Sequence, residues 1–195
     1  TLKVTDNENA SSTDLVLVTV NLNQAPTANG GPDKTANDGD GNNIETLTLD
    51  GAGFDADGFV VSYEWSEGAS VLGTQASLTH AFSVGSHTLT FKVTDNGGAT
   101  TTDTVNVMVN PNQAPVANAG TDKTLTDNDG NGLESVILNG TLSFDPDGNI
   151  VSYEWGEGAT LLGTGAILAI NLAVGTHSIN LTVTDNGGAS SSDNV

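Results

Sequence analysis

Two loops of the chain carry acidic and amide side chains at alternate positions, a spacing that suits calcium coordination. These side chains are Asp38, Asp40 and Asn42 in the first loop and Asp127, Asp129 and Asn131 in the second. Oxygen side chains at alternate positions match the beginning of an EF-hand loop, because calcium prefers oxygen ligands. The match then ends, since Leu138 stands where the closing Glu should be and no helical pattern flanks either loop. We expect either a short calcium loop between two strands or a plain solvated turn.

Side chains that resemble catalytic groups are few, and they lack the partners that catalysis needs. His87 and His177 are equivalent, and each opens an expected strand. The run Ser190–Ser192 has no positioned base, so a serine hydrolase triad is not indicated. Glu67 and Glu157 could pair with nearby glutamates as glycosidase carboxylates, but a solvated strand end explains them better. Cysteine is absent, which removes thiol nucleophiles and disulfides. We predict that the chain is not an enzyme.

The composition is strongly acidic. Twenty-four aspartates and glutamates face four lysines in 195 residues, which gives a formal net charge of −20. Such a chain does not bind nucleic acid by neutralising phosphates, and it does not adsorb to an anionic membrane. It has no long apolar run, so we expect no membrane insertion. Crowded carboxylates favour a divalent cation. The acidic composition, rich in Gly, Asn, Asp and Thr, favours an exported protein at a bacterial cell surface.

Three motifs repeat with a period of about 90 residues, the size of one β-sandwich domain. They are VTDN at Val4–Asn7, Val93–Asn96 and Val183–Asn186, NQAP at Asn23–Pro26 and Asn112–Pro115, and VSYEW at Val61–Trp65 and Val151–Trp155. We predict two units, residues 23–111 and residues 112–195. Residues 1–22 are expected to be the last two strands of a preceding unit. The second unit is expected to lack most of its final strand, and the chain to be a segment of a longer protein.

Within each unit, apolar residues alternate with polar ones over short runs. The residues expected to face the core include Val61, Tyr63, Trp65, Leu89, Phe91 and Val93. Turns rich in Asp, Asn and Gly separate the runs, at Asp55–Gly58, Asp95–Gly98, Asp145–Gly148 and Asp185–Gly188. Period-two alternation between such turns predicts an all-β fold of tandem antiparallel sandwiches.

The order of these motifs resembles the polycystic kidney disease (PKD) domain family in its bacterial extracellular form. The similarity is carried by NQAPVANAGTDKT from Asn112, FDPDGNIVSYEW from Phe144 and VGTHSINLTVTDNGGASSSD from Val174, and it covers nearly all of both units. The resemblance implies immunoglobulin-like sandwiches that act as spacer, adhesive or accessory modules of secreted proteins, without catalysis. One departure is that the usual WDFGDG is WSEGAS from Trp65 and WGEGAT from Trp155.

The resemblance also implies calcium between the entry linker, the DxDG turn and the VTDN turn of each unit. Carried to this sequence, the ligands are Asn23, Asp55, Asp57 and Asp95 in the first unit and Asn112, Asp145, Asp147 and Asp185 in the second. Three aspartates that converge at one end of a sandwich would repel one another without an ion. Each turn alone would need no metal, because Asp and Asn also cap their own backbone. The repetition of three such loops in both units favours bound Ca²⁺.

The ends of the chain suggest association with neighbouring repeats or with copies of itself. Residues 14–21 contain alternating valines, as does the final strand expected in the first unit. We expect one of two arrangements. In the first, neighbouring copies in a periodic array complete each unit. In the second, residues 14–21 of one copy add as a strand to the second unit of another.

These observations favour a structural function, that of a calcium-stabilised spacer or fibre-forming repeat in a large secreted or cell-surface protein. The alternative is an adhesin or carbohydrate-binding accessory module with a polysaccharide or protein ligand. That alternative needs exposed aromatic side chains, whereas Trp65 and Trp155 each share a strand face with Val and Tyr and are expected in the core.

Overall fold

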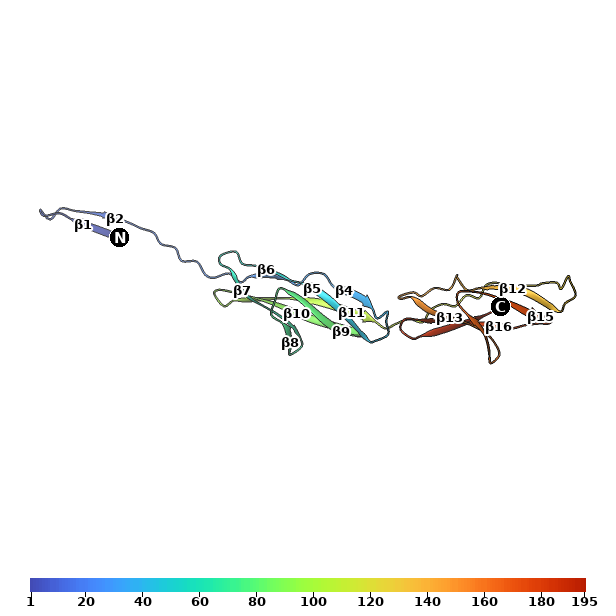
Figure 1. Cartoon of the computed structure of the whole chain (residues 1–195). Coiled ribbons are helices and arrows are strands. Elements are labelled where there is room, and N and C mark those ends of the chain that lie inside the picture. The colour runs from blue at the N-terminus through green and yellow to red at the C-terminus, as the bar shows by residue number, and fades with distance from the viewer.

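The computed structural model describes residues 1–195 and consists of strands joined by turns and loops. Three parts follow one another along an elongated molecule: an N-terminal hairpin, a first sandwich and a second sandwich (Figure 1). No helix with the length and hydropathy needed to cross a membrane is present. The prediction of an all-β fold of tandem immunoglobulin-like sandwiches is confirmed.

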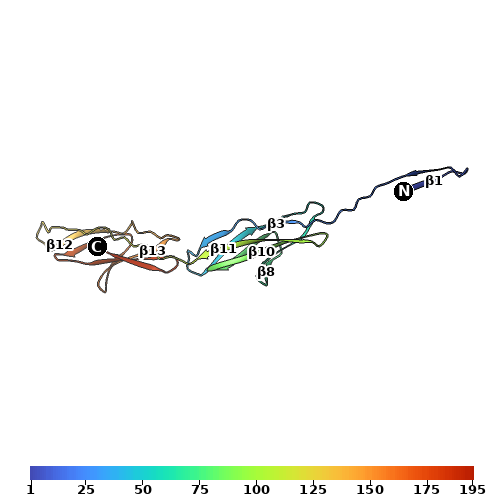
Figure 2. The same ribbon diagram turned by 180° about the vertical axis from the view of Figure 1, so that it is seen from behind.

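The first part is a hairpin that projects away from both sandwiches, as views from opposite sides show (Figures 1 and 2). β1 (Leu2–Thr5) pairs antiparallel with β2 (Ser11–Asp14), and residues 1–25 are all exposed. The alternating valines of residues 14–21 were expected to form a strand, but β2 ends at Asp14 and residues 15–22 belong to no strand. The physical reason is that they have no neighbouring strand to hydrogen-bond with.

One face of the first sandwich is a five-stranded sheet with the order β4-β11-β10-β7-β8. Its strands are β4 (Lys34–Asn37), β7 (Val60–Glu67), β8 (Ser70–Gly73), β10 (Gly85–Asp95) and β11 (Thr100–Asn110). Neighbours are antiparallel except β4, which runs parallel to β11. The remaining strands form two antiparallel pairs, β5 (Ile44–Asp50) with β9 (Ser77–Ser83) and β3 (Thr27–Asn29) with β6 (Ala52–Phe54).

The core of the first sandwich is filled from the inward faces of these strands. It contains Leu49, Trp65, Leu78, Phe82, Leu89, Phe91, Val93, Val105, Val107 and Val109. The inward position predicted for Val61 was wrong. A bulge in the pairing with β10, between Thr94 and Asp95, turns Val60 toward the core and leaves Val61 exposed.

The second sandwich repeats this plan. Its main sheet has the order β14-β13-β16-β17, with β13 (Ile150–Glu157), β14 (Thr160–Thr164), β16 (Ile179–Asp185) and β17 (Ser190–Asn194). Opposite it, β12 (Leu133–Asn139) pairs with β15 (Ile167–Ala173). The separate core consists of Ala119, Val136, Leu138, Trp155, Ile179, Leu181 and Val183.

The two sandwiches differ where the main sheet closes. In the first, β4 pairs with the end of β11, whose last valines fill the core beside it. In the second, residues 123–126 form no strand, and β17 is the edge strand of the main sheet. A cleft of about 710 Å³ lies there instead, and its lining includes Leu138 and Val195.

The sandwiches meet through a short linker and one loop. Pro111 alone separates the end of β11 from the second unit. The loop after β4 packs closely against the second sandwich at two glycines. A Cβ atom at Gly39 would lie 2.7 Å from the backbone oxygen of Asp147, and one at Gly41 would lie 2.5 Å from that of Gly187. The junction is therefore too close-packed for a side chain at either glycine.

Candidate metal centres at the ends of the sandwiches

The loops predicted to carry calcium ligands come together at one end of each sandwich. In the first unit, Asp55 follows β6, Asp95 ends β10, and Asn23 lies on the chain that enters the sandwich. The antiparallel register pairs Asp95 with Val60, which brings the turn of Asp55 and Asp57 beside the end of β10. Strand pairing thus joins groups that are far apart in sequence.

Hydrogen bonds tie the entry chain to the acidic loops. Asn23 donates through Nδ2 to Oδ2 of Asp95 at 3.0 Å, and the N–H of Gln24 donates to Oδ2 of Asp57 at 3.1 Å. Oδ1 of Asp95 accepts from the N–H of Ala99 at 2.9 Å. The Asn23 amide, followed by backbone donors, lowers the pKa of Asp95 below its usual 3.8. This carboxylate is therefore held in its charged form.

Asp55 is the least compensated carboxylate at this end. The residue is 6% exposed, and neither of its carboxylate oxygens has a hydrogen-bond partner. Burial is the main cause that raises the pKa of Asp55, and the charges of Asp57 and Asp95 raise it further. A buried carboxylate without a donor is unfavourable unless a cation or a proton neutralises it. The surroundings of Asp55 therefore suit a bound cation.

The second sandwich repeats this arrangement. Asn112 donates through Nδ2 to Oδ2 of Asp185 at 3.1 Å, and the N–H of Gln113 donates to Oδ2 of Asp147 at 3.0 Å. Oδ1 of Asn112 and Oδ2 of Asp145 are buried and have no partner. One amide oxygen and one carboxylate oxygen, both ligand types that calcium accepts, are thus free at the same end.

No lysine neutralises these acidic ends. The salt bridges of the chain join His87 to Glu67, Lys92 to Glu64 and His177 to Glu157. None of them includes a predicted calcium ligand. The repulsion among the aspartates is therefore not relieved by a side-chain cation.

The three aspartates at each end are neighbours but do not form a closed cage. In this chain, only Asp38, Asp40 and Glu45 bring three acidic groups within 4.8 Å of one another. Calcium lies about 2.3–2.6 Å from its ligands. The ends could therefore enclose an ion only after their side chains draw closer together.

The two loops with alternating Asp and Asn differ in their hydrogen bonds. In the second unit both oxygens of Asp127 accept backbone N–H groups, from Gly130 at 2.8 Å and from Gly132 at 3.0 Å. The N–H of Gly132 is the main cause that lowers the pKa of Asp127. This loop is a self-contained turn. In the first unit, by contrast, Oδ1 of Asp38 is buried and has no partner.

The asparagines of both loops stabilise the turns themselves. Oδ1 of Asn42 accepts from the N–H of Ile44 at 2.7 Å, and its Nδ2 donates to Oδ2 of Asp40 at 2.7 Å. Asn131 makes the equivalent bonds to Leu133 and Asp129 at the same distances. Both amides are therefore turned toward the backbone and the aspartate of their own loop.

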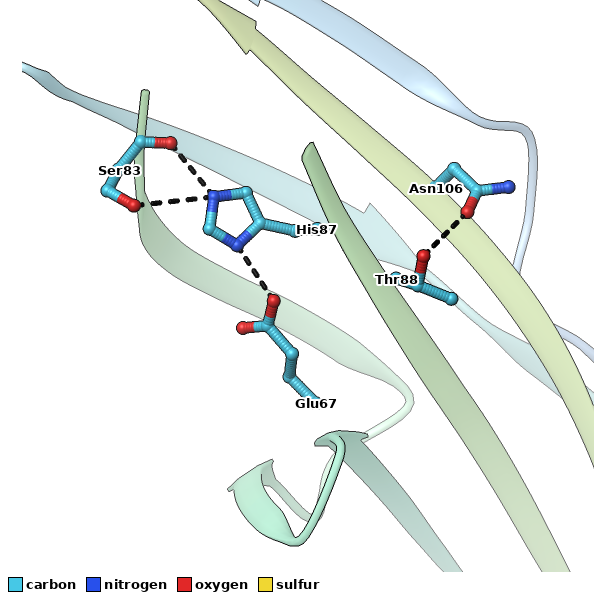
Figure 3. Close-up of polar contacts among 5 residues, drawn as sticks. All are labelled: Glu67, Ser83, His87, Thr88 and Asn106. Atoms are coloured by element: carbon cyan, nitrogen blue, oxygen red, sulfur yellow. Dashed lines mark hydrogen bonds and ion pairs between the residues drawn. The ribbon is translucent and has the colours of Figure 1, made fainter. Parts of the chain in front are cut away.

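One polar cluster, at the opposite end of β10 from Asp95, was not predicted from the sequence (Figure 3). Nδ1 of His87 lies 2.8 Å from Oε1 of Glu67, and Nε2 lies 2.8 Å from the backbone oxygen of Ser83. Because both ring nitrogens face acceptors, the protonated imidazole is favoured. The Ser83 carbonyl is the first cause that raises the pKa of His87, and Glu67 adds to it. The sequence does contain a feature that could have indicated this cluster, because a Glu and a His 20 residues apart occur at equivalent positions of both units.

This cluster has the composition of a Ser-His-acid triad without its geometry. In such a triad, Nε2 accepts the proton of the serine. Here Nε2 of His87 faces the Ser83 carbonyl at 2.8 Å, and the Ser83 hydroxyl is 3.5 Å away. His177 makes the same contacts, to Glu157 at 3.0 Å and to the carbonyl of Ala173 at 2.9 Å, where no hydroxyl exists. The repeated arrangement is structural.

Both tryptophans lie in the cores. Trp65 and Trp155 are 0% exposed. The indole N–H of Trp65 donates to the backbone oxygen of Ala76 at 3.1 Å, and that of Trp155 donates to Gly165 at 3.0 Å. Neither ring is available to stack on a sugar.

Two sandwiches in tandem, each with two acidic turns and an asparagine of the entry chain at one end, define an immunoglobulin-like repeat protein. The family model described as "K319L-like, PKD domain" matches residues 41–109, and the model described as "PKD domain" matches residues 112–195. Together these matches span most of the chain, which belongs to the PKD domain family. The resemblance found in the motifs is confirmed.

Curated relatives contain segments similar to this chain. The human "Dyslexia-associated protein KIAA0319" is 35% identical over 214 residues, which cover 100% of this chain and 19% of that protein. The "Pre-pro-metalloprotease PrtV" of Vibrio cholerae serotype O1 (strain M66-2) is 32% identical over 138 residues, 69% of this chain and 14% of that protein. The chain thus spans about a fifth or less of these relatives.

Among solved structures, the fibronectin(III)-like modules of Clostridium thermocellum CbhA align with a TM-score of 0.39 and 14% sequence identity. The alignment covers 87% of this chain and 91% of that one.

Proposed function

We propose that this chain is a calcium-stabilised spacer of a large extracellular protein, in which successive sandwiches are held in line. The observation that carries the proposal is a set of buried carboxylate oxygens without a hydrogen-bond partner, both oxygens of Asp55 and Oδ2 of Asp145, at the ends where the chain enters each sandwich. Ca²⁺ at these ends would offset the repulsion among the aspartates and use the free oxygens as ligands. The residues that would hold the ion are Asn23, Asp55, Asp57 and Asp95 in the first unit and Asn112, Asp145, Asp147 and Asp185 in the second.

The expected energetic contribution is meaningful for a domain of this size. Extracellular calcium modules bind with dissociation constants of about 10⁻⁴–10⁻³ M. At about 1 mM calcium, each site then adds about 0.5–1.5 kcal/mol by mass action. The total stability of a small domain is only about 5–15 kcal/mol.

The junction supports the spacer role. Asp57 and Gly97 are exposed at the free end of the first sandwich, whereas their equivalents Asp147 and Gly187 are half-buried under the loop after β4. An ion at the second end would therefore be partly enclosed by the first sandwich. Together with a linker of one proline, such enclosure favours a stiff connection.

The test is thermal unfolding of the 195-residue chain with calcium and with EDTA, for the wild type and for Asp145→Asn. We expect calcium to raise the unfolding temperature of both sandwiches in the wild type, and of the first sandwich alone in the variant. Asp122→Asn, an exposed position outside the predicted ligands, is the matched control and should behave as wild type. If chelation left the unfolding temperatures unchanged, the proposal of bound calcium would be refuted, whereas the description of the fold would stand.

A second candidate function, adhesion to a polysaccharide or protein, is favoured by exposed phenylalanines. Phe54, Phe59 and Phe144 are 67%, 64% and 56% exposed. Phe54 and Phe59 flank the turn of Asp55 and Asp57, so one surface combines aromatic rings with carboxylates. Binding on a glycan array that is lost in Phe54→Ala would support this function over that of a passive spacer.

We also propose copies of the chain as partners. Leu17 and Val20 of the extended segment are each 88% exposed, and the cleft beside Leu138 is apolar in part. Residues 14–21 of a second copy would add to the second sandwich as a strand that occupies this cleft. Light scattering should then show concentration-dependent association that Val18→Asp abolishes. A wild-type chain that stays monomeric at high concentration would argue against strand addition.

A further inference from the structure

The loop after β4, together with the start of β5, contains the tightest acidic cluster of the molecule. One carboxylate oxygen from each of Asp38, Asp40 and Glu45 lies within 4.8 Å of the others. Two oxygens bound to one calcium ion, each about 2.4 Å from it, can be at most about 4.8 Å apart. The spacing of the three groups therefore already fits one ion, unlike the spacing of the aspartates at the ends of the sandwiches.

Asp38 provides an independent sign that a ligand belongs here. The residue is 1% exposed, and its Oδ2 accepts from the N–H of Asn43 at 2.8 Å. Its Oδ1 is buried and accepts no hydrogen bond. A buried carboxylate oxygen is seldom left without a donor, because the lost hydration is costly. No salt bridge of the chain involves this cluster.

The equivalent loop of the second unit makes the contrast clear. There the N–H of Gly130 donates to Oδ1 of Asp127 at 2.8 Å and so occupies the oxygen that is free in Asp38. In the first unit the equivalent N–H, that of Gly41, is directed instead to the backbone oxygen of Asp38, at 3.5 Å. Nearly the same sequence thus forms a closed turn in one unit and an open oxygen site in the other.

The open site lies directly at the junction. The N–H of Asp38 donates to the backbone oxygen of Asn110 at 2.9 Å, the last residue before the linker. Within the same loop, the backbone oxygen of Gly39 accepts from Nδ2 of Asn186 in the second sandwich. An ion that fixes this loop would therefore fix one wall of the junction.

We propose that Asp38, Asp40 and Glu45 bind a divalent cation, calcium, and that this ion sets the orientation of the second sandwich relative to the first. Glu45 shares the inward face of β5 with Leu47 and Leu49, and Asp40 is exposed. One ligand is therefore buried, one is half-buried and one is exposed, which leaves room for water to complete the coordination sphere. The inference extends the proposed spacer function, but its ligands are separate from those at the ends of the sandwiches.

The experiment is a calcium titration of the isotope-labelled 195-residue chain followed by ¹H–¹⁵N NMR. The amides of Gly39, Gly41 and Asn43 report the loop, whereas those of Gly58 and Gly97 report the end of the first sandwich. We expect saturable shifts at the loop amides, weakened about tenfold or more in Glu45→Gln. Glu134→Gln, the equivalent change beside the closed loop, should leave these shifts as in the wild type.

Residual dipolar couplings measure the orientation. With calcium, both sandwiches of the wild type should fit one alignment tensor, and in Glu45→Gln they should diverge while each sandwich stays folded. If the end amides shifted with calcium and the loop amides did not, the loop site would be refuted. The proposed function as a calcium-stabilised spacer would not be affected. The reverse pattern would retain the loop site and refute calcium at the end of the first sandwich. If neither the loop amides nor the end amides shifted with calcium, both the loop site and the site at the end of the first sandwich would be refuted.

Discussion

Asn186 of the second sandwich donates a hydrogen bond through Nδ2 to the backbone oxygen of Gly39 in the first. The two residues are 147 positions apart, and they belong to two different motifs, the VTDN turn and the loop with alternating Asp and Asn. Each motif repeats along the chain, but only at the junction does one copy of each meet the other. The junction therefore joins two acidic loops through neutral backbone and amide groups.

Gly39→Val tests the packing of this junction. An added Cβ would lie 2.7 Å from the backbone oxygen of Asp147, so the loop and the second sandwich must move apart. We expect the two sandwiches to reorient independently, with little change in the unfolding temperature of either one. Small-angle scattering should show a broader range of interdomain distances.

The matched control is Asn128→Val, at the equivalent position of the second unit, where the loop is exposed. It should leave the scattering curve unchanged. If Gly39→Val also gave the wild-type curve, the close contact would not determine the orientation.

Asn112→Ala removes one donor and one buried acceptor from the end of the second sandwich. The side chain donates to Asp185 at 3.1 Å, and its Oδ1 is buried without a partner. We expect a loss of about 1–3 kcal/mol in the free energy of unfolding of the second sandwich, and a weaker response of that sandwich to calcium. Chemical denaturation with and without calcium measures both effects.

Asn23→Ala makes the same change at the free end of the first sandwich, where the residue is exposed. The loss there should be smaller, because water can replace the missing amide. Equal losses at both positions would show that enclosure by the neighbouring sandwich is unimportant.

Leu89→Ala tests whether the two cores are independent. Leu89 is 0% exposed within the first core, which shares no residue with the second. Truncation should cost about 2–5 kcal/mol and lower the protection of amides in the first sandwich alone. Hydrogen exchange measured by strand reports this directly.

The equivalent variant, Ile179→Ala, should lower protection in the second sandwich in the same selective way. A loss of protection that spread across both sandwiches in either variant would mean that they unfold as one unit.

The histidine clusters predict a dependence of stability on pH. The pKa values of His87 and His177 are raised above 6.5 in the folded state, first by the backbone carbonyls of Ser83 and Ala173. A proton bound more tightly by the folded state stabilises it fully below about pH 6.5, and this stabilisation is lost as the pH rises through the raised pKa. The free energy of unfolding should therefore fall as the pH rises above about 6.5.

Replacement of both histidines by glutamine should flatten this dependence, whereas His80→Gln, outside the clusters, should not. Urea unfolding across the pH range supplies the measurement. An equally steep decline in the double variant would assign the effect to other groups.

Much of the fold follows from local patterns in the sequence. Alternation at Leu89, Phe91 and Val93 identifies the core face of β10, because side chains of a strand point to opposite sides in turn. The same rule fails at Val61, where a bulge in the pairing with β10 shifts the register and Val60 faces inward instead. A bulge depends on the partner strand, so the sequence of β7 alone does not predict it.

The candidate sites divide in the same way. The repeated motifs alone locate the acidic loops and indicate that they gather at the ends of the sandwiches. They do not distinguish Asp38 from Asp127, which occupy equivalent positions in similar loops. Only the tertiary structure distinguishes them. The backbone of Asp38 is hydrogen-bonded to the end of β11, and its loop packs against the second sandwich. Asp127 instead accepts hydrogen bonds from backbone N–H groups of its own turn. The spacing of residues determines which groups are available, and contacts with distant parts of the chain decide which oxygen atoms stay free.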